Sequence, residues 1–171
     1  MDKLYIKARG KVNLTLNVLD KREDGYHDLE SVFQIINLYD EMYIEKTNSC
    51  SLELICNIEN LENGNNIISK AYALLRKKHS EIKGIKVTLI KNIPNESGIG
   101  GGSADCANFL IAMNKLFNLN YTKHDLIDIG KTLGADVPPC LHTNALFATR
   151  NWRKNRKNKY FFKILSRYYK T

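Results

Sequence analysis

The chain lacks the sequence features of a metal protein, a disulfide-bonded protein or a membrane protein. Its 171 residues include four cysteines, and these form neither a Cys-x-x-Cys pair nor a metal-ligand spacing. No apolar run is long enough to cross a bilayer, and no signal-peptide segment precedes the first strand pattern. We therefore expect a reduced, cytoplasmic protein of one domain, or of one domain and part of another.

The end of the chain has no acidic residues. Residues 148–171 contain neither aspartate nor glutamate but hold nine of the 26 lysines and arginines. Residues 1–147 carry 17 basic and 18 acidic residues, a net charge of −1, so the tail supplies the whole positive excess of the chain. One interpretation is a tail that binds nucleic acid, because aromatic residues lie among its cations.

A shifted reading frame explains this tail better, and we favour it over nucleic-acid binding. When residues 148–171 are written in A/T-ending codons and read one nucleotide out of frame, they become QQEIGEKIEKINIFLKYYQDIIK, which has balanced charge and amphipathic spacing. We expect residues 1–147 to form a nucleotide-binding domain and residues 148–171 to be an out-of-frame, disordered tail. We call the protein that is read in the shifted frame from residue 148 onward the frame-restored protein.

The most informative segment is the glycine-rich run at residues 94–105, Pro-Asn-Glu-Ser-Gly-Ile-Gly-Gly-Gly-Ser-Ala-Asp. It holds four of the ten glycines and leads directly into an amphipathic helix pattern, with one apolar stripe at Ala107, Leu110, Met113 and Phe117. Glycines let the backbone approach an anion, and the unpaired N–H groups of a first helical turn favour phosphate. The run lacks the Walker A lysine and the dinucleotide-binding spacing. The run therefore predicts a phosphate-binding loop of neither of these two types, and we favour this interpretation over a flexible glycine linker.

The remaining patterns predict an α+β fold. Alternating apolar residues indicate half-buried strands at 4–8 and 12–18, then strands at 31–38, 41–47, 51–58 and 85–89. One helix begins after Asn65 or Asn66. A last helix begins at Thr122, where Asp125 completes a capping box, and ends at Gly134.

Three further segments accompany the glycine-rich run: Lys11-Val12-Asn13-Leu14-Thr15-Leu16, Asp24-Gly25-Tyr26-His27 and Gly134-Ala135-Asp136-Val137-Pro138. With the run, they resemble the GHMP kinases and, within that superfamily, the 4-diphosphocytidyl-2-C-methyl-D-erythritol kinases of non-mevalonate isoprenoid biosynthesis. The resemblance covers residues 3–147. It implies the superfamily's N-terminal domain, which is similar to the second domain of ribosomal protein S5, without the C-terminal domain. It also implies ATP- and Mg²⁺-dependent phosphorylation of the 2-hydroxyl of a cytidine diphosphate substrate, impaired by the truncation.

The same resemblance assigns roles to individual residues. Asp136 matches the family's base and Lys11 the lysine beside it; because a carboxylate is a weak base for an alcohol, the cation must also stabilise the developing charge. The implied ATP-binding residues are Asn65, Asn66, Pro94, Gly98, Ile99, Gly100, Gly101, Gly102, Ser103 and Ala104. The implied substrate-binding residues are Asn13, Tyr26 and His27, with Tyr26 stacking on the cytosine and His27 hydrogen-bonding to it. No side chain would ligate Mg²⁺ directly, and Ser103 is the candidate for contact with the metal's shell.

Simpler interpretations exist for these residues. Lys11 would be a solvated strand lysine, Asp136 a turn residue before a proline, and Ser103 a helix N-cap. For the whole protein, the alternatives are another GHMP small-molecule kinase, which would not need Tyr26 and His27, or an inactive domain that binds nucleic acid through its tail. We expect a small-molecule partner and no membrane, and the oligomeric state stays open.

Overall fold

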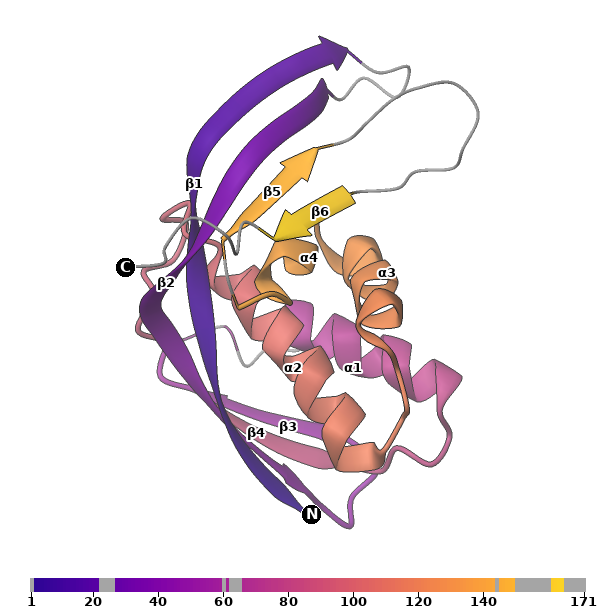
Figure 1. The fold of residues 1–171 in the computed structure, drawn as a ribbon. Coiled ribbons are helices and arrows are strands. Elements are labelled where there is room, and N and C mark those ends of the chain that lie inside the picture. Colours follow the sequence, from indigo (N-terminus) through magenta and orange to yellow (C-terminus); the bar gives the residue numbers. More distant parts are fainter. Residues whose placement is uncertain are drawn as a thin grey trace, which may run out of the picture.

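The computed structural model describes residues 2–21, 27–59, 61, 66–143, 145–149 and 161–164. A six-stranded sheet carries the helices on one face (Figure 1). The strands are β1 (Lys3–Lys21), β2 (His27–Lys46), β3 (Leu52–Cys56), β4 (Ile85–Ile90), β5 (Leu146–Thr149) and β6 (Phe161–Ile164). The helices are α1 (Ile67–Lys78), α2 (Gly101–Phe117), α3 (Lys123–Leu133) and α4 (Val137–Cys140). The predicted α+β class is confirmed.

A long antiparallel hairpin of β1 and β2 replaces the four short strands predicted over residues 4–47. The register of β1 shifts between Arg9 and Lys11 and again between Asn13 and Thr15, and such bulges interrupt the alternation without ending the strand. Beyond Asn13, Leu14, Leu16 and Val18 are 60%, 54% and 61% exposed. The prediction of a half-buried strand is therefore wrong there, because this end of the hairpin extends past the helices (Figure 1).

The strands follow the order β3-β4-β2-β5-β6, with β1 paired to β2. β3 runs parallel to β4, and α1 makes the connection between them. β6 pairs antiparallel with β5, so the prediction of a disordered tail is wrong for residues 148–149, which end β5, and for Phe161–Ile164. The edge of β5 offers unpaired backbone groups, and the aromatic and β-branched residues of this segment favour a strand. The remainder of the predicted tail beyond Thr149 lies outside the described residues.

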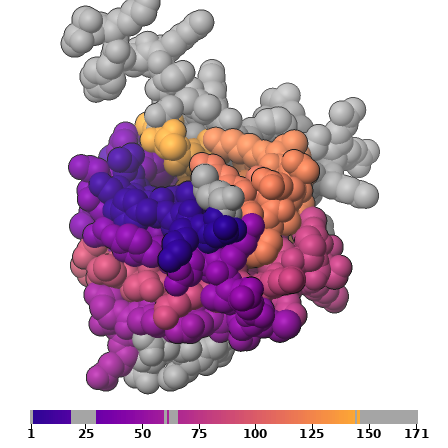
Figure 2. All heavy atoms as spheres, turned by 90° about the horizontal axis from the view of Figure 1, so that it is seen from below, coloured from indigo at the N-terminus to yellow at the C-terminus, as the bar shows by residue number. Residues whose placement is uncertain are grey.

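Helix α2 is the centre of the core. It is buried on more sides than the single predicted stripe, since Phe109 and Ala112 are fully buried along with Leu110 and Met113. The cause is its position, because α2 contacts β1, β2 and all three other helices. Figure 2 views the molecule from a second direction and shows the orange segment that includes α3 to the right of β1, which is indigo. The surrounding elements thus hold α2 in place.

The helix ends follow local capping rules. The side chain of Asn66 accepts a hydrogen bond from the Ser69 amide at 2.8 Å, so Asn66 and not Asn65 caps α1. Thr122 and Asp125 form the predicted capping box of α3. In the described part of the chain, no helix combines the length and the apolar character needed to cross a membrane.

Candidate active site

The glycine-rich run forms the N-terminus of α2. Gly100 is the N-cap with φ of 74°, a left-handed conformation that suits glycine, and no side chain caps the helix there. The first helical hydrogen bond runs from the Ala104 amide to the Gly100 carbonyl at 2.8 Å. The amides of Gly101, Gly102 and Ser103 precede it and therefore have no acceptor within α2. Three such N–H groups and the helix dipole make this turn suited to an anion. Ser103 lies inside the helix, so its N-cap interpretation is wrong.

A pocket of about 370 Å³ opens in front of this turn. Its lining consists of Ile67, Lys91, Pro94, Asn95, Glu96, Ser97, Gly98, Gly100, Gly101, Gly102, Ser103 and Asp136. Six of the predicted ATP-binding residues, all from the glycine-rich run, are among them: Pro94, Gly98, Gly100, Gly101, Gly102 and Ser103. The structure thus gathers these residues and the predicted base, Asp136, around one cavity.

Sequence reasoning missed Ile67 and Lys91 on this lining. A signal for Lys91 was present, because it continues the alternation of the buried residues Ile85, Val87 and Leu89 and so falls on the inner face of the sheet. A lysine at an inward position needs charged partners.

Other predicted ATP-binding residues lie off the pocket. Ile99 accepts a hydrogen bond from the Lys11 amide at 2.8 Å and so ties the run to β1. Ala104 is fully buried and its amide is used by the helix. Asn66 caps α1 and is not on the lining. Asn65 and Tyr26 lie outside the described residues, and for His27 the structure gives only its strand backbone, paired with Lys21.

The predicted catalytic pair comes together beside the pocket. Lys11 Nζ lies 3.1 Å from Asp136 Oδ2 and donates to Asn13 Oδ1 at 2.7 Å. Lys11 is only 4% exposed, so its interpretation as a solvated strand lysine is wrong. A Cβ added to Gly100 would lie 3.1 Å from Lys11 Cε, which shows how closely the glycine-rich run packs on the lysine stem. Asp136 stands at the start of α4, but its side chain makes no capping bond there.

A buried charge cluster lies behind the run. Lys91 Nζ forms ion pairs with Asp40 and, at 2.6 Å, with Asp105 Oδ2. Burial raises the pKa of Asp105 to about 7, against the opposing effect of Lys91. Among the described residues, Asp105 Oδ1 has no hydrogen-bond partner, although it is buried. Burial lowers the pKa of Lys91, but its ion pairs with the two aspartates outweigh burial and raise it overall.

Gly102 and Gly101 differ in what an added methyl group would meet. A Cβ on Gly102 would meet no atom within 4 Å, whereas a Cβ on Gly101 would lie 3.0 Å from Ile93 Cγ2 and 3.2 Å from Lys91 Nζ. We expect Gly102→Ala to keep the melting temperature and to weaken ATP binding at least tenfold (about 1.4 kcal/mol), because the methyl group enters the pocket. Gly101→Ala should instead lower the melting temperature. Calorimetric titration with ATP and thermal unfolding of both variants check this, and unchanged ATP affinity in Gly102→Ala would favour the linker interpretation.

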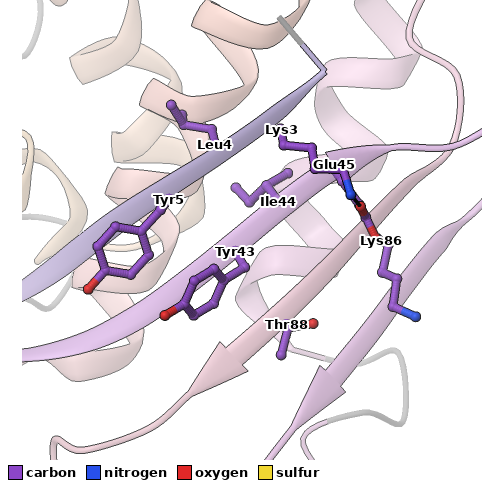
Figure 3. Close-up of a pocket in the computed structure, with 8 residues that line it drawn as sticks. All are labelled: Lys3, Leu4, Tyr5, Tyr43, Ile44, Glu45, Lys86 and Thr88. Atoms are coloured by element: carbon purple, nitrogen blue, oxygen red, sulfur yellow. Dashed lines mark ion pairs between the residues drawn. The ribbon is translucent and has the colours of Figure 1, made fainter.

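A second hollow, of about 340 Å³, lies on the other side of β1, β2 and β4 (Figure 3). Tyr5 and Tyr43 project from it side by side, and an ion pair of 2.7 Å joins Lys3 to Glu45. The Tyr5 hydroxyl donates to Glu41 at 2.8 Å, and this bond raises the pKa of Tyr5 to about 12. These groups are paired with one another and include no acid–base pair beside an anion site, so the glycine-rich pocket is the stronger candidate site.

A direct protein site for a metal ion is not found in the described segments. No group of three or more His, Cys, Asp or Glu side chains there could hold one. The four cysteines all lie in described residues and none of them forms a disulfide there; burial raises the pKa of Cys106 and Cys140 to about 12. These two buried thiols are therefore poor metal ligands and nucleophiles.

Comparison with known proteins gives one consistent result. Residues 66–144 match the profile of the GHMP kinases N terminal domain. The 4-diphosphocytidyl-2-C-methyl-D-erythritol kinase of Caldanaerobacter subterraneus subsp. tengcongensis is 44% identical over 153 residues, which are 89% of this chain and 53% of that protein. The kinase of the same name from Clostridium beijerinckii is 44% identical over 139 residues, 81% of this chain and 49% of that protein.

Solved structures agree with these matches. A crystal structure of 4-(cytidine 5'-diphospho)-2C-methyl-D-erythritol kinase superposes with a TM-score of 0.72 at 33% identity, over 85% of this chain and 51% of that one. Homoserine kinase from Cytophaga hutchinsonii superposes with a TM-score of 0.65 at 18% identity, over 86% of this chain and 48% of that one, and shares the fold. The chain spans about half the length of the curated relatives it matches.

Proposed function

The chain belongs to the GHMP kinase family through its N-terminal domain, and on this premise we propose that it binds ATP and carries the catalytic pair for phosphorylating 4-diphosphocytidyl-2-C-methyl-D-erythritol on its 2-hydroxyl. The observation that supports this most is the ion pair of 3.1 Å between the buried Lys11 and Asp136, which lines the pocket at the N-terminus of α2. A base, a cation and an anion site thus adjoin one another, as transfer of a phosphoryl group to an alcohol requires.

Each group has a definite task in this reaction. The free amides of the first turn of α2 hold the ATP phosphates, and Asp136 accepts the proton of the attacking hydroxyl. Lys11 orients that hydroxyl and stabilises the negative charge that develops on its oxygen. Asn13 fixes the direction of Lys11 through their bond of 2.7 Å and adds an amide for substrate. Ser103 on the lining is the candidate hydroxyl for Mg²⁺ bound with ATP, and that ion would spread the charge of the transferred phosphate.

In this proposal, recognition of the cytidine group determines which alcohol the enzyme accepts as its substrate. We assign stacking on the cytosine to Tyr26 and hydrogen bonding to His27, and we place the reaction in the cytoplasm, where thiols stay reduced. Another GHMP small-molecule kinase is the second candidate, since homoserine kinase shares the fold.

A substrate comparison tests the proposal. The 171-residue chain and the frame-restored protein are each incubated with ATP, Mg²⁺ and one alcohol: the cytidine diphosphate compound, homoserine or mevalonate. We expect the frame-restored protein to consume ATP only with the cytidine compound, and the 171-residue chain to bind ATP with little turnover. Turnover with homoserine or mevalonate instead would assign the second candidate. A 171-residue chain that does not bind ATP would contradict the proposal for this domain.

A further inference from the structure

Asp40 is a fully buried carboxylate that takes no part in the catalytic pair. Its Oδ1 accepts hydrogen bonds from the amides of Asn92 at 2.6 Å and Ile93 at 2.8 Å. Its Oδ2 accepts from the ammonium of Lys91. One carboxylate on β2 therefore binds three consecutive residues of another segment, and a buried charge with this many donors is well compensated.

Those three residues are the lead-in from β4 to the glycine-rich run. The pairing of β2 with β4 ends at Glu41 and Ile90, so residues 91–93 follow the last rung of the ladder. Beyond Ile90, side chains and not a neighbouring strand form the hydrogen bonds to the backbone. Asn57 accepts from the Lys91 amide at 2.7 Å and donates to the Lys91 carbonyl at 3.2 Å. Asp40 then supplies acceptors for the next two amides, and the lead-in has a fixed course although it belongs to no strand.

The far end of the run is fixed in a different way. The Lys11 amide donates to the Ile99 carbonyl at 2.8 Å, and a Cβ on Gly10 would lie only 2.6 Å from the Ile99 side chain. The exposed residues 94–98 span the distance between these two attachments. The position of the run against α2 thus depends on its attachment to β1 at one end and on Asp40 and Asn57 at the other.

We propose that Asp40 is a positioning residue for the phosphate site, which holds the lead-in and the Lys91 ammonium so that the run has its binding geometry before nucleotide arrives. Lys91 lines the pocket and Asp40 does not, so Asp40 acts through its neighbours. Ordering the run during folding removes that entropy cost from the binding step. This inference rests on the proposed function, because it takes ATP as the ligand of the pocket.

A matched pair of variants tests this role in the full 171-residue chain. Asn114 is the control, because its side chain binds both the amide of Tyr121 at 3.0 Å and its carbonyl at 2.9 Å. It does so at the other end of α2, about 20 Å from Gly101 at a rise of 1.5 Å per residue. We expect Asp40→Asn to weaken ATP binding at least tenfold in calorimetric titration, while Asn114→Ala leaves ATP affinity unchanged. Thermal unfolding of both variants shows whether they are comparably destabilised.

The outcomes separate the two proposals. No ATP binding by the unaltered chain would overturn the proposed function and this inference together. ATP binding that is equally strong in Asp40→Asn, or weakened to the same degree in Asn114→Ala, would overturn this inference alone. Should Asp40→Asn not fold, amide hydrogen exchange of the unaltered chain without nucleotide decides: we expect the Asn92 and Ile93 amides to exchange as slowly as those of β4, and exchange as fast as at Asn95 would overturn the role.

Discussion

Asp136→Asn should lower the turnover number of the frame-restored protein by about 10²- to 10⁴-fold, the usual contribution of a general base. The amide keeps the size of the carboxylate and an oxygen for Lys11, which lies 3.1 Å away, but it cannot accept the proton of the attacking hydroxyl. The dissociation constant for ATP should change little, because in the proposed site the amides of α2 and not Asp136 hold the phosphates. Single-turnover phosphorylation and calorimetric titration with ATP measure the two quantities separately.

The control for this variant is Asp128→Asn. Asp128 also pairs with a lysine, Lys131, at 2.8 Å, and its side chain is similarly exposed, but it lies on α3 and not on the pocket. The Asp128→Asn protein should keep the full turnover number of the parent. An Asp136→Asn protein that turns over within tenfold of the parent would remove Asp136 from the role of base and would leave Lys11 as the main catalytic group of the pair.

Helices α1, α2 and α3 were predictable from the sequence because their signals are local, whereas the four-residue α4 was missed and the helix at Thr122 was wrongly taken as the last. Thr122 with Asp125, Gly134 and the Asn66 cap each act within one helical turn. The hairpin was less predictable, because a bulge such as the one between Asn13 and Thr15 depends on the partner strand. The burial of Leu16 and Val18 was mispredicted for a related reason, since alternation does not tell whether a second layer covers the strand.

The part of the candidate site that is formed by backbone amides was predictable from the sequence. Gly100 and the amides after it follow from the glycine spacing, whereas the closeness of Lys11 and Asp136 came only from family resemblance, because many residues separate them in the chain. The buried cluster was missed entirely. Its members, Asp40, Lys91 and Asp105, lie on three different segments, and no local pattern links them. Only the inward register of Lys91 indicated that such partners had to exist.

Removing the Lys91 ammonium should strongly destabilise the fold. Lys91→Met leaves the carboxylates of Asp40 and Asp105 buried without their cation, and breaking a buried pair in this way costs about 3–5 kcal/mol of unfolding free energy. The control is Lys86→Met on β4, where a partly exposed lysine pairs with Glu53 at 3.0 Å. Such a surface pair contributes about 0–1 kcal/mol. Urea unfolding of the two variants measures the difference.

The destabilisation by Lys91→Met should depend on pH in a definite direction. Asp105 already has a pKa of about 7 against a usual 3.8, and loss of the nearby ammonium raises it further. A carboxyl whose pKa is higher in the folded than in the unfolded protein binds more protons when folded, so stability rises as the pH falls from about 7 toward about 4. In the parent this proton uptake is centred at about pH 7, and in Lys91→Met it moves to higher pH, so the stability lost relative to the parent should be largest above about pH 7 and should shrink as the pH falls through about 7. Adding Asp105→Asn should restore part of the lost stability above about pH 7. A difference in unfolding free energy between Lys91→Met and the parent that stays constant as the pH falls through about 7 would mean that the two carboxylates find solvent in the variant, and that the cluster is not a closed, dry unit.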